Sequence, residues 1–303
     1  MATGWLLSAL TYLAAVVFIG GAIRKAVQYA RAPMHLRWEL YPVPHEKGKE
    51  YGGSYFEEAD WWAHPRETSL AAEIRAMLEE ILLIRSLWHR NRPQWYASFP
   101  FHVGIYFLAA LVVLILLGAA LEIAGAATAL GPLWGAVQLA TVLCGAIGII
   151  SASAGAMALL WRRVADPNLK RMSTTSDYFN LLFILVAFLS AGFAWLTTDN
   201  SFGLLREYFR AVLSFSAPAG IQPAVAAEVA AASLFLIYLP FTHMTHFVAK
   251  YFTYHQVRWD DAPNLGDPRM LARLQANLAR PVGWSAPHIQ PDRNWAEVAT
   301  EVK

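Results

Sequence analysis

Long runs of apolar residues recur five times along this 303-residue chain, separated by stretches that carry nearly all of its charge. An α-helix needs about 20 apolar residues to cross the hydrocarbon core of a bilayer. We therefore predict an all-α integral membrane protein, a bundle of five transmembrane helices. The predicted spans cover residues 5–23, 101–123, 133–161, 178–196 and 229–248.

The long polar segment between the first two spans has a helical pattern in its second half, over residues 69–88. Its apolar residues recur at the spacing of one helix face: Leu70, Ile74, Met77, Leu78, Ile81, Ile84, Leu87 and Trp88. This pattern predicts an amphipathic helix that either lies at the membrane interface or packs under the preceding loop. A shorter amphipathic stretch, 202–213, is predicted to lie flat on the opposite surface.

Composition supports a membrane location, because only 15% of the residues are charged, against about 25% in soluble domains. The basic residues set the orientation: 22 of the 24 Lys and Arg side chains fall on one side of the predicted bundle. Since cytoplasmic loops are rich in Lys and Arg, we predict the N-terminus outside, the C-terminus in the cytoplasm, and a multi-pass protein of the inner (cytoplasmic) membrane. The ends of the spans are called inner and outer on this basis.

The predicted organisation has four parts: a first span (1–25), a cytoplasmic loop with the amphipathic helix (26–99), a four-helix transmembrane region (100–254) and a cytoplasmic tail that docks a partner (255–303). The single cysteine, Cys144, excludes an internal disulfide and a cysteine-ligated cluster. Iron–sulfur centres would therefore belong to another chain. We expect contact with lipid and no nucleic-acid partner.

Three of the nine histidines, His102, His243 and His246, lie inside predicted spans, where ionisable side chains are costly and usually mark function. His102 and His246 fall near the inner ends of two different spans. Two imidazoles at matched depth can bind opposite faces of a haem iron, so both are candidate metal ligands. The alternative is hydrogen bonding between helices without a cofactor.

His243 lies three residues before His246, which on a continuous helix is about 4.5 Å deeper. It is the candidate catalytic residue, placed to hydrogen-bond a quinone carbonyl or a haem propionate, or to replace His246 as ligand. Arg162, Arg163 and Lys250 lie at inner ends of spans and are candidates for neutralising haem propionates. Their alternative role is that of topology signals.

Three segments resemble the gamma subunit of respiratory nitrate reductase: YASFPFHVGIYF (96–107), LPFTHMTHFVAKYFTYHQVR (239–258) and RRVADPNLKRMSTTSDYFNLL (162–182). The resemblance covers the second to fifth spans and implies a cytochrome b subunit with haem b ligated by His102 and His246. In that family a second pair of histidines binds an outer haem, and here Val112 and Glu228 stand at those positions. We therefore expect one haem b, on the cytoplasmic side.

The first cytoplasmic loop is longer than in the nitrate reductase family, which favours a relation to the membrane subunits of heterodisulfide-reductase-like and sulfite-reduction-associated complexes. These pair with a cytoplasmic iron–sulfur protein. The predicted function is that of the quinone-linked, electron-transferring anchor of an oxidoreductase complex, inactive alone, with menaquinone or ubiquinone as substrate. The alternatives are a non-redox scaffold and, with less support because spans one to four carry almost no charge, a transporter.

Overall fold

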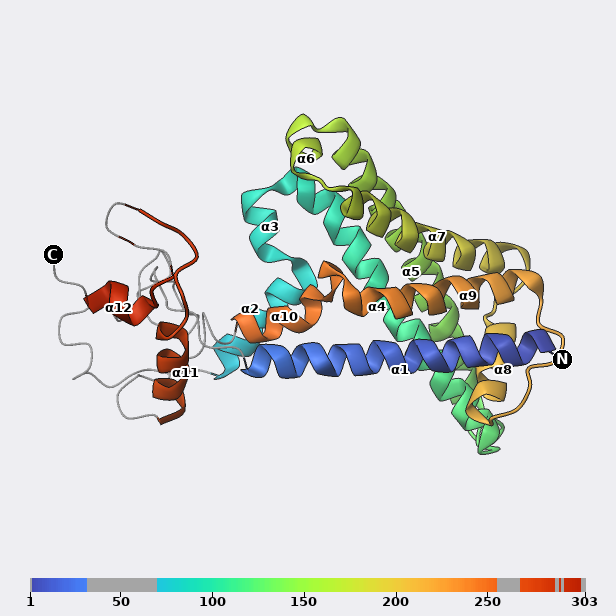
Figure 1. The fold of residues 1–303 in the computed structure, drawn as a ribbon. Coiled ribbons are helices and arrows are strands. Elements are labelled where there is room, and N and C mark those ends of the chain that lie inside the picture. Colours follow the sequence, from blue (N-terminus) through green and yellow to red (C-terminus); the bar gives the residue numbers. More distant parts are fainter. Residues whose placement is uncertain (1, 32–69, 255–267, 287–288, 290–291, 301–303) are drawn as a thin grey trace. The chain divides into compact units, whose positions relative to one another are not determined.

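The computed structural model describes residues 2–31, 70–254, 268–286, 289 and 292–300. Five of its helices are long and apolar enough to cross a membrane, which confirms the predicted number (Figure 1). They are α1 (Ala2–Arg31), α4 (Arg92–Ile123), α5 (Pro132–Ala165), α7 (Thr175–Thr197) and α9 (Pro223–Tyr238), the last extended by a 3-10 turn to Phe241.

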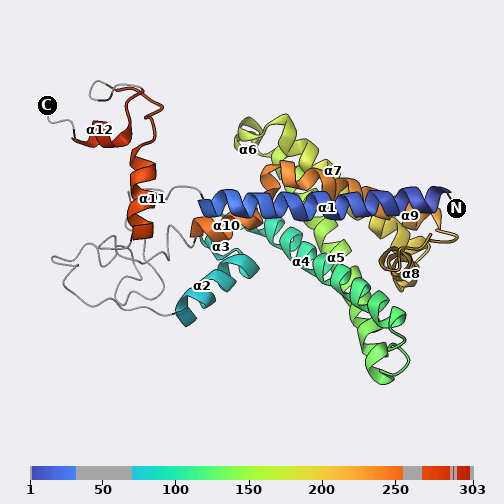
Figure 2. The same ribbon diagram turned by 60° about the horizontal axis from the view of Figure 1, so that its bottom comes forward.

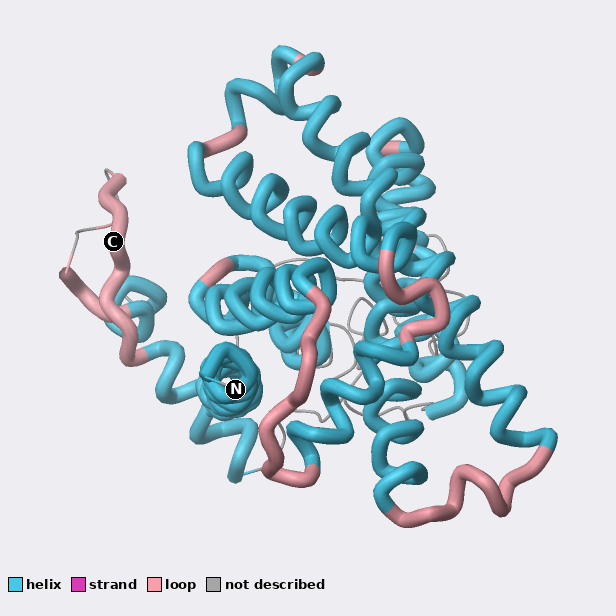
Figure 3. Tube along the Cα trace, turned by 90° about the vertical axis from the view of Figure 1, so that its right-hand side faces the viewer, coloured by secondary structure: helices cyan, strands magenta, loops and turns pink. Residues whose placement is uncertain are grey.

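All regular elements of the described part of the chain are helical (Figure 3), as predicted. The shorter helices are α2 (Leu70–Leu83), α3 (Arg85–Arg90), α6 (Pro167–Met172), α8 (Gly203–Leu213), η3 (Leu239–Phe241), η4 (His243–Thr245), α10 (His246–Tyr254), α11 (Pro268–Leu278) and α12 (Trp295–Thr300). The chain divides into two compact units, 1–20 with 79–242 and 21–78 with 243–303, and each is described by itself.

Local sequence signals explain where the helices begin. The Asn91 side chain accepts a hydrogen bond from the backbone N–H of Gln94 at the start of α4. Asp166 caps α6 in the same way, and Thr174 with Asp177 forms a capping box on α7. These side chains satisfy N–H groups that have no partner within the helix.

Helices α4 and α5 pack with their backbones in close contact over several turns (Figure 2). A Cβ atom at Gly104 would lie 2.6 Å from Ala152 Cα, and one at Gly155 would lie 2.5 Å from Phe101 Cα. Small residues allow such an approach and are typical of helix pairs in membranes. The two glycines therefore fix how α4 and α5 cross.

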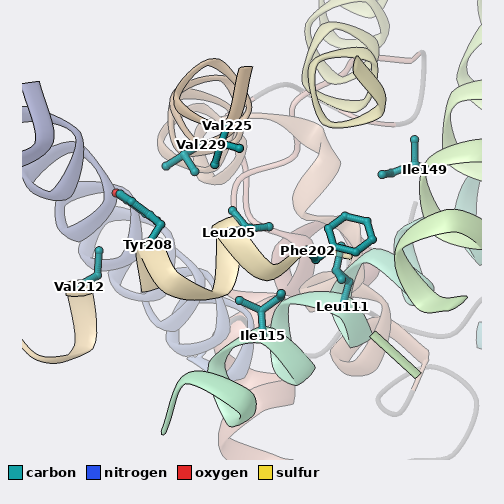
Figure 4. Packing of buried hydrophobic residues seen from close by; sticks show 9 residues of the cluster. All are labelled: Leu111, Ile115, Ile149, Phe202, Leu205, Tyr208, Val212, Val225 and Val229. Atoms are coloured by element: carbon teal, nitrogen blue, oxygen red, sulfur yellow. The ribbon is translucent and has the colours of Figure 1, made fainter. Parts of the chain in front are cut away.

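The amphipathic helix α8 packs its apolar side against other helices of the first unit, and that it lies flat on the outer surface stays a prediction. Its apolar side is buried among α4, α5 and α9 (Figure 4), in a cluster formed by Leu111, Ile115, Ile149, Phe202, Leu205, Tyr208, Val212, Val225 and Val229. Phe202, immediately before α8, is only 1% exposed and reaches Gly145 of α5. Burying this apolar face among other helices stabilises the fold more than contact with the membrane interface would. Helix α8 therefore closes the outer half of the bundle.

The predicted helix over 69–88 is interrupted. Ile84 adopts a left-handed conformation (φ 50°), which ends α2 and starts α3. Tertiary contacts compensate for the lost helical hydrogen bonds: the Trp95 indole donates to the Leu83 carbonyl at 2.8 Å, and the Glu80 carboxylate accepts from the Ser86 N–H at 2.8 Å. The periodicity alone contained no signal for this break.

The predicted fifth span is also not one continuous helix. α9 ends at Tyr238, and Thr242 is extended (φ −112°, ψ 169°) between the two 3-10 turns. Pro240 has no N–H and its ring crowds the preceding turn, which favours an end or a kink of the helix there, although α4 continues through Pro100. His243 and His246 are thus not on one continuous helix, so the expected rise of about 4.5 Å between them does not apply.

The C-terminal tail contains two helices, Pro268–Leu278 and Trp295–Thr300. Val282 and Ile289 between them are buried, and isolated bridges pair Pro281 with Asn294 and Ala286 with Ile289. That the tail docks a partner stays a prediction. Residues 32–69, most of the predicted cytoplasmic loop, lie outside the described residues.

Candidate functional site

His102 lies three turns into α4, which begins nine residues before the predicted span. Its Nδ1 is 2.7 Å from the carbonyl oxygen of Ser98, one turn earlier on the same helix. A carbonyl oxygen only accepts, so Nδ1 donates and carries the proton. The lone pair is then on Nε2, the arrangement in which histidine ligates a metal while its other nitrogen is held by a hydrogen bond.

The face of α4 that carries His102 is turned away from α5. Phe101, Gly104 and Leu108 all contact α5. With about 100° of rotation per residue, these three positions share one face and His102 lies more than about 90° from its centre. A planar cofactor bound to His102 would therefore not lie between α4 and α5, where the backbones leave no room.

Two aromatic residues on the His102 side of α4 hold the end of α2. Trp95 donates to the Leu83 carbonyl, and the Tyr106 hydroxyl donates to the Ile81 carbonyl at 2.6 Å. These two residues lie about two turns before and one turn after His102 on the same side of α4, and the end of α2 is hydrogen-bonded to both.

The other predicted site residues of the fifth span lie in the second unit. His243 opens the 3-10 turn η4, and His246 is the first residue of α10. Lys250 is four residues after His246, which places both on one face of α10. His102 belongs to the first unit, so the pairing of His102 with His246 stays a prediction.

Arg162 and Arg163, the predicted propionate partners of the first unit, both make hydrogen bonds at the inner end of α5. Arg162 Nε donates to Gln94 Oε1 of α4 at 3.0 Å, and Arg163 donates to the Ser173 hydroxyl at 2.8 Å. These contacts connect α5 to α4 and to the α6–α7 turn. Neither hydrogen bond involves His102. That Arg162 and Arg163 neutralise haem propionates therefore also stays a prediction.

Sequence reasoning missed Ser98, whose carbonyl selects the tautomer of His102. Because the acceptor is a backbone carbonyl, which every residue has, the sequence carried no specific signal for this contact. Sequence reasoning also missed the hydrogen bond of 2.8 Å from Tyr238, the last residue of α9, to the buried Asn180 of α7. Asn180 is a lone polar residue in an apolar span, and such residues usually join helices.

Among the described side chains there is no group of three or more His, Cys, Asp or Glu residues that could hold a metal ion. Haem iron takes its protein ligands from one or two side chains, and the tautomer of His102 suits this role. A profile of the nitrate reductase gamma subunit matches residues 86–260. The chain belongs to this family.

The match covers more than half of the chain, from α3 to beyond α10, and includes His102, His243 and His246. The nitrate reductase gamma family consists of membrane cytochrome b subunits of multi-subunit oxidoreductase complexes. This chain is thus a multi-pass membrane subunit of redox type. Comparison with curated proteins and with solved structures found no match.

Proposed function

We propose that this member of the nitrate reductase gamma family is the haem b-carrying subunit through which an oxidoreductase complex exchanges electrons with the quinone pool. The observation that carries the proposal is His102, held by Ser98 with its proton on Nδ1, within the segment that matches the family. Haem b supplies one-electron transfer when bound. The chain supplies the ligands and the apolar surroundings.

A single haem on the inner side is supported by the packing of the outer half. The positions where the family has its second pair of ligands are Val112 and Glu228. Nearby, the side chains of Phe202, Leu205 and Tyr208 fill the space between α4 and α9. An apolar cluster that is already closed favours one cofactor, bound by His102 and His246.

We further propose that the quinone binds in the inner half of the bundle, with His243 as its hydrogen-bond partner, and that Lys250, Arg162 and Arg163 balance the charge of the haem propionates. The partner is a cytoplasmic iron–sulfur subunit, as in the heterodisulfide-reductase-like complexes. Support for a cytoplasmic partner comes from the tail, whose helix α11 keeps Leu271 exposed. Because this chain has a single cysteine, the iron–sulfur clusters are assigned to the partner subunit.

The visible spectrum of the purified protein tests the haem. We expect a b-type band after reduction, lost in His102→Ala and in His246→Ala. His89→Ala is the matched control, because His89 lies on α3 outside the candidate site and its replacement leaves the band unchanged. A colourless wild-type protein contradicts the redox function and favours the scaffold.

The quinone site is tested separately, on protein that keeps its haem. We expect His243→Gln to slow reduction of the haem by a quinol analogue at least about tenfold, while chemical reduction and the spectrum are unchanged. Resistance mutations against quinone-site inhibitors that map to the outer half of the bundle would contradict an inner site.

A further inference from the structure

A pocket of about 460 Å³ lies at the outer end of the first unit, beside α8 and the loop of residues 214–222 that follows it. Ile123, the last residue of α4, and Val225, in the first turn of α9, both line this pocket. It therefore lies at the level where one membrane span ends and another begins. Its volume falls in the range of about 300–1,000 Å³ that is typical of small-molecule sites.

The pocket joins the buried interior of the unit to an exposed apolar border. Tyr208 and Val225, which line it, are 3% and 1% exposed and belong to the buried cluster of this unit (Figure 4). Ile123, Leu213 and Phe215, at or next to lining positions, are exposed, Phe215 by 78%. Exposed apolar side chains at the end of a membrane span are typical of contact with lipid. An amphipathic molecule of the bilayer therefore fits this pocket better than a ligand dissolved in water.

Arg210 and Glu207 of α8 are the charged residues among those that line the pocket. The guanidinium of Arg210 lies 3.8 Å from the Glu207 carboxylate and 4.0 Å from that of Glu122. Both distances exceed the range of about 2.7–3.2 Å of a hydrogen bond. Among the described residues no oxygen accepts a hydrogen bond from the Arg210 guanidinium, and this side chain is 48% exposed. Its N–H groups are therefore available to a ligand.

The charges around the pocket balance, which restricts the class of ligand. Arg206 pairs with Glu122 at 2.7 Å, and Arg210 and Glu207 are the remaining two charges. The planar guanidinium of arginine matches the oxygen atoms of a phosphate group. A free phosphate or an anionic lipid would gain this contact, but it would also lie close to the Glu207 carboxylate, which no further cation of the lining offsets. A headgroup that carries both a phosphate and an ammonium group satisfies Arg210 and Glu207 together.

We propose that this pocket binds the headgroup of a zwitterionic phospholipid of the outer leaflet, of the phosphatidylethanolamine type. Its phosphate accepts hydrogen bonds from the Arg210 guanidinium, and its ammonium group donates to the Glu207 carboxylate. The acyl chains extend along the exposed apolar residues Ile123, Leu213 and Phe215. A lipid held in this way bridges α4, α8 and the start of α9, so it stabilises the outer end of the bundle. This site goes beyond the proposed electron transfer and does not depend on the haem.

Thermal unfolding of the purified protein in a maltoside detergent tests the site, because a ligand that binds only the folded state raises the unfolding temperature. The probes are dihexanoyl-phosphatidylethanolamine, dihexanoyl-phosphatidylglycerol and inorganic phosphate. We expect a saturable rise with the first probe and no saturable rise with the other two. Arg210→Gln and Glu207→Gln are each expected to raise the concentration of half-maximal stabilisation at least about tenfold, because a charged hydrogen bond is lost.

Arg171→Gln is the matched control, since Arg171 is an exposed basic residue on α6, outside the pocket, and this variant is expected to respond as the wild type does. Arg210 is half-exposed, so its replacement is expected to leave the fold intact. Ala219→Trp is a second variant: it fills the pocket without removing a charge and should abolish the response. An equal rise with phosphatidylglycerol, a saturable rise with phosphate alone, or an unchanged response in Arg210→Gln would each overturn the proposal.

Discussion

At the scale of single residues, the two glutamates near the outer ends of the spans have opposite surroundings. Glu122 of α4 lies 2.7 Å from the Nε of Arg206, whose guanidinium also stacks over the ring of Trp134 at 5.3 Å. Glu228 of α9 has no such partner among the described residues. The same residue type is thus paired with a cation at one position and buried without one at the other.

The pair between Glu122 and Arg206 predicts a loss of stability when Glu122 is replaced. We expect Glu122→Gln to lower the free energy of unfolding by about 1–3 kcal/mol, because a largely buried Arg206 loses a charged hydrogen-bond partner. Glu207→Gln is the matched control, since Glu207 faces Arg210 at 3.8 Å on the exposed side of α8 and such pairs contribute less than about 1 kcal/mol. Thermal unfolding in detergent measures both; equal effects would contradict the assigned role of the Glu122–Arg206 pair.

Histidine 102 shows at the same scale how a backbone atom prepares a ligand. The Ser98 carbonyl receives the Nδ1 proton, so the ring is oriented and its tautomer selected before any metal binds. Ser98→Ala is expected to keep this contact and to remove only that of the Ser98 hydroxyl, which lies 3.3 Å from Nδ1.

At the scale of helices, the contact between α4 and α5 depends on backbone proximity. A Cβ at Gly155 would meet the backbone of Phe101, which cannot move away without shifting α4. Since Phe101 is adjacent to His102, the crossing of these helices also sets the position of the candidate ligand.

We expect Gly155→Ala to cost at least about 2 kcal/mol of stability, because an added methyl group overpacks the contact. Gly135→Ala, on the same helix, is the control: no atom lies within 4 Å of its Cβ position, and Ala is the better helix former by about 1 kcal/mol. Unfolding of the two variants in detergent should move in opposite directions. Similar shifts in both would mean that α4 and α5 are not in close contact there.

Two helices are interrupted, each for its own reason. α2 ends where Ile84 adopts a left-handed conformation, and side-chain hydrogen bonds from Trp95 and Tyr106 replace backbone bonds there. α9 ends at Tyr238, two residues before Pro240, which lacks a backbone N–H.

At the scale of the whole molecule, the distribution of charge predicts how the chain sits in the membrane. Nearly all basic residues lie on one side of the five spans, and Arg206 and Arg210 lie on the other. Membership of the nitrate reductase gamma family adds that the protein is one subunit of a larger complex. The orientation decides on which side of the membrane the partner is found.

Cysteine labelling tests the orientation. In a Cys144→Ala background, we expect Ser216→Cys, which is exposed between α8 and α9, to react with a membrane-impermeant maleimide added outside intact cells. Ser285→Cys, exposed in the tail, should react only after the membrane is permeabilised. Labelling of the tail position in intact cells would reverse the orientation and place His102 on the outer side.

The number of spans, their approximate positions and the family could be predicted because each depends on short-range properties. Twenty apolar residues make a membrane helix wherever they occur, and a motif such as 239–258 is continuous in the chain. The helix starts also follow from local capping residues such as Asn91 and Thr174.

The arrangement of the site depended on contacts between segments far apart in sequence. Burial of α8, the break at Ile84 and the burial of Glu228 all arise from what packs against each residue, which the periodicity of the sequence does not show. Even the contact between Ser98 and His102, which is local, needed the rotamer that packing selects. The hydrophobic pattern thus decides which segments enter the membrane, because the free energy of transfer into lipid is summed residue by residue. The geometry of the ligands and the pairing of charges depend instead on neighbours that only the folded chain supplies.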